Sequence, residues 1–159
     1  MEKTMNHQRR QVLKSAGAAG VVGVAVAAGL LKPTAVYADW NAAGFEAREL
    51  SAALKAIKAE GAADSGQITV KAPDIAENGA VVPVEVTSNI PGTESIAIVA
   101  DKNNFPLIAQ FDLMNGAEGF VSTRIKLGST SHVRAFVRAG GKMHTAAKEV
   151  KVTIGGCGG

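Results

Sequence analysis

The side chain best suited to covalent chemistry stands almost at the end of this sequence. The only cysteine among the 159 residues is Cys157, within the closing stretch KVTIGGCGG. A single thiol cannot form a disulfide within its own chain. Nothing near it in sequence would promote its ionisation, and a free thiol is mostly protonated at neutral pH. Cys157 is therefore suited to being activated or attacked by other proteins rather than to acting as a nucleophile by itself.

Two glycines stand on each side of this thiol. Because glycine has no Cβ, a glycine stretch is flexible and thin enough to enter a narrow channel. Counted from a last strand that should end near Ile154, the three residues to Cys157 can extend about 10 Å. We therefore predict a flexible carrier arm over residues 155–159, with Cys157 as the point of covalent substrate attachment. The glycines of this arm, two on each side of the thiol, are Gly155, Gly156, Gly158 and Gly159. The alternative is an unstructured end whose cysteine is incidental or links two copies by a disulfide.

The N-terminal stretch has the features of an export signal. Arg9 and Arg10 are followed by two apolar residues and a lysine, which resembles the twin-arginine signal, and an apolar stretch from residue 16 to 31 comes next. Small residues then predict cleavage between Ala38 and Asp39. A membrane anchor is the alternative, but the apolar stretch is shorter than the roughly 20 residues of a span and is interrupted by glycines. We expect export to the periplasm by the twin-arginine pathway and no permanent membrane anchor.

Removal of this signal changes the charge balance. The whole chain has 17 basic and 14 acidic residues and a net charge of +3. Residues 1–38 hold five of the basic residues and one of the acidic ones, so the remainder has a net charge of −1. A basic pI that belongs to the signal gives no reason to expect a nucleic-acid partner. The roughly 120 residues that remain are enough for one domain with a hydrophobic core.

Residues 39–66 are predicted to form one amphipathic helix and a linker. Between residues 41 and 60, apolar side chains recur at steps of three, four and three residues, which places them on one helical face. These side chains are Ala47, Leu50, Leu54 and Ile57. Gly61 and the small residues after it end the pattern. Because such a short helix is marginal alone, we expect its apolar face to pack on a sheet or a partner.

Residues 67–154 alternate between apolar and polar side chains, as half-buried strands do. Turn-rich breaks such as NIPGTES, DKNNFP and AGGK separate the runs. Clean alternation over many short runs indicates antiparallel sheets with one buried face. We therefore predict a mainly β fold, an immunoglobulin-like antiparallel β-sandwich of about seven strands. The runs are QITV, 80–88, SIAIVA, 107–113, 121–127, 132–138 and 144–154.

No catalytic cluster is recognisable within the predicted sandwich. His132 and His144 lack the spacing of metal ligands and the carboxylates are scattered, so we expect no metal site and no enzymatic activity. One surface feature has two interpretations. If GSTS were a hairpin turn, four basic residues would share one solvent-exposed face. That face would be a docking surface for an acidic partner or, more simply, a solvated sheet. The residues are Arg124, Lys126, Arg134 and Arg138.

Several stretches closely resemble the SoxY family, the sulfur-compound carriers of the periplasmic Sox system of thiosulfate oxidation. The most specific is GGCGG at the extreme C-terminus, after a strand written KEVKVTI. PDIAENGAVVPVEV, ADKNNFPLIAQFDL and TRIKL before TSHVRAFV are also similar to that family. With the twin-arginine signal included, the resemblance covers nearly the whole chain.

The resemblance implies a function for the arm. In SoxY-like proteins the cysteine that corresponds to Cys157 carries pathway intermediates, and the protein performs no turnover itself. SoxY pairs with SoxZ, a second immunoglobulin-like subunit. The haem enzyme SoxAX couples thiosulfate to the cysteine, and the metal-dependent hydrolase SoxB releases sulfate and leaves a persulfide. The sulfane dehydrogenase SoxCD, where present, oxidises the remaining sulfur. We accordingly expect a SoxZ-like subunit and these enzymes as partners, and no cofactor on this chain.

Two other classes of protein compete with this interpretation. An exported thiol–disulfide protein would need a CxxC pair or a setting that stabilises a thiolate, and the sequence has neither. An exported β-sandwich interaction protein that dimerises through a Cys157 disulfide stays open on the residues alone.

Overall fold

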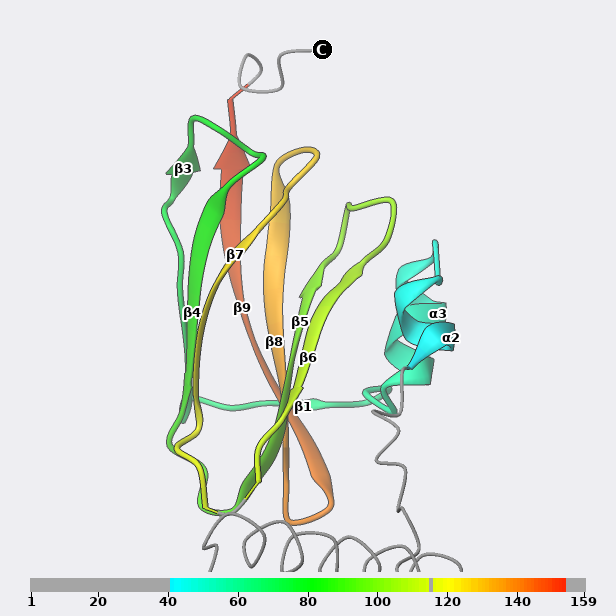
Figure 1. Cartoon of the computed structure of the whole chain (residues 1–159), viewed down its shortest axis with the longest axis vertical. Coiled ribbons are helices and arrows are strands. Elements are labelled where there is room, and N and C mark those ends of the chain that lie inside the picture. Colours follow the sequence, from blue (N-terminus) through cyan, green and yellow to red (C-terminus); the bar gives the residue numbers. More distant parts are fainter. Residues whose placement is uncertain (1–40, 115, 154–159) are drawn as a thin grey trace, which may run out of the picture. The chain divides into compact units, whose positions relative to one another are not determined.

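Two β-sheets lie face to face in the computed structural model, which describes residues 41–114 and 116–153 (Figure 1). The larger sheet has six strands, in the order β1-β9-β8-β5-β6 with β3 also paired to β9, and the smaller has three, in the order β2-β4-β7. The long strands pair antiparallel, whereas the two-residue β1 and β3 run parallel to β9. The strands are β1 (Ala63–Asp64), β2 (Ile68–Lys71), β3 (Ile75–Ala76), β4 (Val82–Ser88), β5 (Thr93–Ala100), β6 (Leu107–Asp112), β7 (Phe120–Ile125), β8 (Ser131–Ala139) and β9 (Lys142–Val152).

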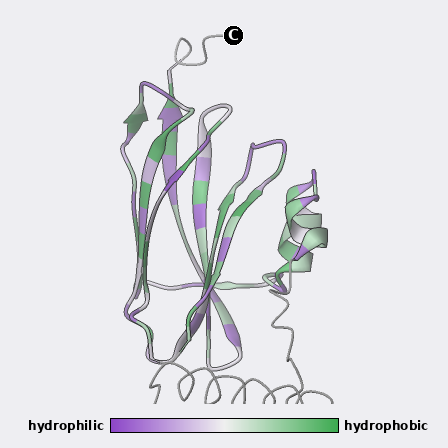
Figure 2. Ribbon diagram, in the orientation of Figure 1, coloured by the Kyte–Doolittle hydropathy of each residue, from purple (hydrophilic) through white to green (hydrophobic). Residues whose placement is uncertain are grey.

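The predicted immunoglobulin-like sandwich is confirmed, because each of the seven predicted runs forms a strand. Successive residues of a strand face opposite sides of the sheet, so the apolar half of each run is turned inward. In β4, for example, Val82, Val84 and Val86 are fully buried, and Pro83 between them is exposed. Figure 2 shows this pattern as alternating apolar and polar segments along the strands. Each fully buried valine or isoleucine stabilises the fold by about 1.5–3 kcal/mol relative to an exposed position.

The single helix predicted over residues 41–60 is wrong, because two short helices stand there: α2 (Ala42–Phe45) and α3 (Leu50–Ala56). Asn41 caps α2 by accepting a hydrogen bond on Oδ1 from the Gly44 N–H, and Glu49 is extended before α3. The chain breaks between the helices because packing on the sheet overrides the periodicity. Gly44 lies so close to Leu107 that a Cβ there would stand 2.7 Å from Leu107 Cδ2.

The expected docking of the apolar helical face is confirmed. Its four residues pack in a second hydrophobic cluster on the outer side of the larger sheet, where Ile57 is 5% exposed. The sheet contributes Val99, Leu107 and Phe136 to this cluster. β5 is therefore buried on both faces from Ile96 to Ala100, which explains why this stretch is apolar without alternation.

A β-bulge interrupts the alternation predicted for residues 107–113. The register of β5 against β6 shifts between Ile98 and Val99, so that Ile98 faces Ala109 and Val99 faces Leu107. As a result Leu107 packs beneath the helices, whereas Phe111 packs against the core between the sheets. The prediction that these two residues share one face is wrong for that reason.

The hairpin considered at GSTS is not formed. β7 pairs with β4 in the smaller sheet and β8 pairs with β5 and β9 in the larger one, so the connection crosses between the sheets. Arg124 therefore lies on a different sheet from Arg134 and Arg138. Arg134 pairs with Asp101, and Arg138 donates a hydrogen bond to the Ile57 carbonyl. The common basic face is therefore not formed. Alternation predicts which side chains share one face of a strand, but it does not predict which sheet the strand joins.

The predicted export signal, with Arg9, Arg10 and the Ala38–Asp39 cleavage pair, lies outside the described residues. Among the helices within the described ranges, none is long and apolar enough to cross a membrane.

Candidate functional site

The predicted attachment residue Cys157 and the glycines of the arm, Gly155, Gly156, Gly158 and Gly159, lie outside the described residues. The last described residue is Thr153, directly after β9. What the structure contributes is therefore the point from which the arm leaves the domain. We call Lys151–Thr153 the arm root.

β3 holds one side of the arm root. Ile75 and Ala76 pair with Lys151 and Val152 in a short parallel ladder. The Lys151 N–H donates to the Asp74 carbonyl over 2.9 Å, and the Thr153 N–H donates to the Ala76 carbonyl over 3.2 Å. These backbone bonds continue the ordered strand up to the last described residue.

The connection between β7 and β8 holds the other side. The Val152 N–H donates to Thr130 Oγ1 over 3.0 Å. Gly79 packs under the same point, since a Cβ there would stand 2.9 Å from Val152 Cγ1 and 2.5 Å from the Leu127 carbonyl oxygen. Leu127 also donates its N–H to the Gly79 carbonyl over 2.7 Å. The arm root is thus fixed on both sides by segments far from it in sequence.

This anchoring limits how far the thiol can travel. Cys157 follows Thr153 by four residues, so its Cα can lie at most about 13–14 Å from that of Thr153. A protein that binds Cys157 in its own active site must therefore bring the entrance of that site close to this end of the sandwich.

A pocket lies at the same end. Its volume is about 460 Å³, and residues of the β5–β6 loop and of the β7–β8 connection line it. We call it the arm-end pocket. Ser129 belongs to its lining and directly precedes Thr130, which bonds the arm root. Figure 1 shows both loops and the end of β9 at the same end of the sandwich. The lining residues are Lys102, Asn103, Asn104, Phe105, Lys126, Gly128 and Ser129.

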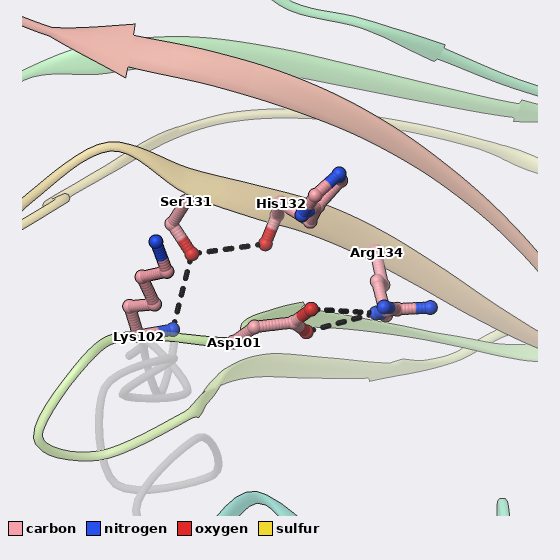
Figure 3. A network of polar contacts seen from close by, with 5 residues as sticks. All are labelled: Asp101, Lys102, Ser131, His132 and Arg134. Atoms are coloured by element: carbon pink, nitrogen blue, oxygen red, sulfur yellow. Dashed lines mark hydrogen bonds and ion pairs between the residues drawn. The ribbon is translucent and has the colours of Figure 1, made fainter.

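Side-chain hydrogen bonds hold the two walls of the pocket together. Asn103 bridges them, because its Nδ2 donates to the Lys126 carbonyl over 2.7 Å and its Oδ1 accepts from the Gly128 N–H over 3.1 Å. Buried Ser131 joins the loop to β8: its Oγ accepts from the Lys102 N–H and donates to the His132 carbonyl (Figure 3). Both bonds fix the backbone beside the pocket.

An ion pair completes this network. Asp101 binds the Arg134 Nε with both carboxylate oxygens at 2.9 Å, and their side chains are 15% and 35% exposed. Figure 3 shows Asp101 beside Lys102 at the start of the loop and Arg134 on β8, which points toward it. The one carboxylate at the base of the loop is thus already neutralised by a cation.

Sequence reasoning missed this pocket because its residues are unremarkable in sequence. DKNNFP was interpreted as a turn-rich break, and Lys126 was assigned to the basic face of the sheet. The repeated asparagine in a loop was the only signal, since asparagine side chains commonly bond neighbouring backbone groups. The two histidines behave as ordinary strand residues: His132 is exposed and His144 half-buried. Within residues 41–114 and 116–153, no group of three or more acidic, histidine or cysteine side chains is placed to hold a metal ion.

Comparison with known proteins gives a consistent result. The family described as "Sulfur oxidation protein SoxY" matches residues 54–157. The sulfur carrier protein SoxY from Chlorobium limicola f thiosulfatophilum is 39% identical with a TM-score of 0.55, covering 71% of this chain and 92% of that chain. Superoxide reductase (Neelaredoxin) from Ignicoccus hospitalis is 19% identical with a TM-score of 0.48, over 55% of this chain and 80% of that one. The identity and TM-score of that second structure are too low to support a conclusion about this chain. No curated protein matches the sequence.

The family match covers more than half of the chain and reaches residue 157, the position of the only cysteine. The solved SoxY structure covers a similar share at well over 30% identity. This chain therefore belongs to the SoxY family of sulfur oxidation proteins.

Proposed function

We propose that this protein is a sulfur carrier of thiosulfate oxidation that holds its cargo covalently on Cys157. The observation that carries the proposal is the family match, which extends through residue 157 and so includes the thiol. A related chain of 39% identity is itself described as a sulfur carrier protein. The described domain adds an anchored arm root, and the glycine-flanked Cys157 follows it four residues later in the sequence.

The chemistry assigned to Cys157 has two balanced steps. In the first, the thiol and thiosulfate form a cysteine S-thiosulfonate and release one proton and two electrons. A haem enzyme of the SoxAX kind accepts the electrons. In the second, water attacks the terminal sulfonate sulfur, which leaves as sulfate with release of a proton, and a persulfide stays on Cys157. A hydrolase of the SoxB kind supplies the site for this step, and the carrier contributes only the tethered sulfur.

The position of the thiol fits a pathway in which other enzymes catalyse each step and this chain only holds the sulfur. Several enzymes must bind the same adduct in turn, and a terminal cysteine between glycines can enter a narrow site where larger side chains would clash. The arm, residues 155–159, would be the flexible tether of the adduct, and the sandwich would be the folded domain that bears the arm. No residue of this chain need act as an acid, base or metal ligand.

The setting of the reaction is part of the same proposal. The pattern around Arg9 and Arg10 favours twin-arginine export and cleavage after Ala38, which would place the mature chain in the periplasm. There it would form a heterodimer with a SoxZ-like subunit and meet the SoxAX-like and SoxB-like enzymes. A sulfane dehydrogenase of the SoxCD kind would oxidise the persulfide where the organism makes one.

The competing function is an exported β-sandwich that dimerises through Cys157. Replacement of the thiol separates the two. We expect Cys157→Ser, in complex with its SoxZ-like subunit, to fold normally and to reduce thiosulfate-dependent electron transfer in a reconstituted system to background. The measurement is cytochrome reduction after addition of thiosulfate to the carrier, the haem enzyme and the hydrolase.

A reversible block of the same thiol provides the control. Wild-type carrier treated with a methylthiolating reagent should be inactive and should recover fully after a thiol reductant. Undiminished electron transfer by Cys157→Ser, with loss only of a disulfide-linked dimer, would contradict the carrier function and support the dimer.

A further inference from the structure

We propose that the arm-end pocket is a docking site for acidic surface loops on the enzymes that process the Cys157 adduct. The proposal rests on the carrier function and adds to it a place on the folded domain where those enzymes bind. It assigns the recognition to Lys102 and Lys126, with Phe105 as the apolar side chain of the same lining.

The short reach of Cys157 brings its enzymes close to the pocket. Cys157 can lie no farther than about 13–14 Å from Thr153, so an enzyme that encloses the thiol must also approach the arm root. The Val152 N–H bonds Thr130, and the neighbouring Ser129 lines the pocket. The pocket therefore begins within about 10 Å of the arm root, given a Cα spacing of roughly 3.8 Å. The surface around the enzyme's entrance has to meet this region while the adduct is bound.

The charged side chains that line the pocket are cationic. The lining contains two exposed lysines, two asparagines and a serine, and of the residues that the structure describes no carboxylate lines it. Neither Lys102 nor Lys126 forms an ion pair within residues 41–114 and 116–153. Arg48 adds a third cation, since its guanidinium carbon lies 4.9 Å from the centre of the Phe105 ring. A surface with three exposed cations and no lining carboxylate attracts a partner that carries Asp and Glu.

The pocket combines an exposed aromatic ring with walls that hydrogen bonds hold in place. Phe105 is 45% exposed although it is apolar, so the pocket offers a partner both an aromatic surface and cationic groups. Asn103 and Ser131 fix the two walls by hydrogen bonds, which means that little ordering of the pocket is needed on binding. The pocket is open and modest in size, as suits a contact that must form and dissociate in every cycle.

The position of the pocket predicts which kinetic constant of the enzyme changes when the pocket charges are lost. Charges at the rim of an interface act mainly on the rate of association and on its salt dependence. The pocket lies outside the enzyme's active site, so its loss should raise the KM for the loaded carrier and leave kcat almost unchanged. Hydrolysis of the adduct at saturating carrier should therefore continue at the normal rate.

The test compares two charge-reversed double variants, each loaded on Cys157 with a thiosulfonate and paired with the SoxZ-like subunit. Lys102→Glu/Lys126→Glu alters the pocket. Lys55→Glu/Lys142→Glu makes the same change in charge on exposed lysines away from the arm root. Lys142 stands opposite Ala139 at the far end of β8, and Lys55 lies two residues before Ile57, whose carbonyl accepts a hydrogen bond from Arg138 near that end. Sulfate release by the purified hydrolase is followed against carrier concentration at low and high NaCl.

We expect the pocket variant to raise KM at least tenfold at low salt with kcat within twofold, and high salt to bring wild type and variant together. The control variant should stay within twofold of wild type. Equal KM values for pocket and control variants would overturn the proposal while leaving the carrier function intact. Failure of the hydrolase to release sulfate from loaded wild type would overturn both.

Two further experimental results would identify a different occupant of the pocket. Binding of inorganic thiosulfate to unloaded wild type, lost in the pocket variant without a change in KM, would mean a small-anion site and would overturn docking. Faster spontaneous loss of the adduct in the pocket variant without the enzyme, again at unchanged KM, would mean that the arm itself occupies the pocket. That result would overturn docking as well.

Discussion

Gly79 is the residue on which the arm root depends most closely. It lies between the Leu127 carbonyl and the Val152 side chain, both of which come nearer than any Cβ would tolerate. Because the φ angle of Gly79 is not positive, the glycine is required by space and not by backbone conformation. A single methyl group at this position would press the β3–β4 connection away from β9.

We therefore expect Gly79→Ala to destabilise the protein by about 1–3 kcal/mol through overpacking. Gly66→Ala is the matched control, since nothing lies within 4 Å of a Cβ there and φ is again not positive. That change should be neutral or stabilising by up to about 1 kcal/mol. Urea unfolding of both variants measures the difference, and equal stability would show that the contact at Gly79 relaxes freely.

At the scale of elements, the end of β9 is an anchored strand terminus rather than a fraying one. β3 supplies backbone bonds on one edge, and Thr130 supplies a side-chain acceptor on the other. Strand ends without such partners open readily, and their amide hydrogens exchange quickly. A fixed arm root matters for a carrier because it defines the volume that a short arm can reach.

Thr130→Val removes the acceptor while keeping the shape of the side chain. We expect the Val152 amide to exchange its hydrogen about fivefold faster, which corresponds to the roughly 1 kcal/mol of one hydrogen bond. The Val150 amide, farther inside the β8–β9 ladder, should be unaffected. Thr153→Val is the control, because its hydroxyl makes only a 3.5 Å contact to the Glu77 carbonyl. Unchanged exchange at Val152 would show that β3 alone holds the arm root.

At the scale of the whole molecule, the sequence predicted local features well and long-range pairing poorly. Alternation identified the seven main strands, since each strand's inward residues are fixed by its own neighbours. It could not show that β7 and β8 belong to different sheets, so the hairpin considered at GSTS and the common basic face that would follow from it are not formed. The two-residue β1 and β3 carry no periodic signal. Nor does the periodicity mark the helical break at Glu49, on either side of which Phe45 and Leu50 pack in one cluster with Leu107 of β6.

The same contrast between local features and long-range contacts applies to the site. The thiol and its glycines are visible in the sequence because their chemistry is local to five residues. The anchor and the pocket are not visible, because they join segments around Gly79, Asn103, Thr130 and Val152 that only the fold brings together. A carrier function could therefore be proposed before the fold was known, whereas the arm-end pocket could not be predicted.

The most direct test of the central claim is the mass of the protein during turnover. Intact mass spectrometry would be applied to the mature protein from cells that are oxidising thiosulfate, before and after a mild thiol reductant. We predict adducts of thiosulfonate and persulfide mass that map to Cys157 and disappear on reduction. Only free thiol and a Cys157–Cys157 dimer, in cells that oxidise thiosulfate actively, would contradict it.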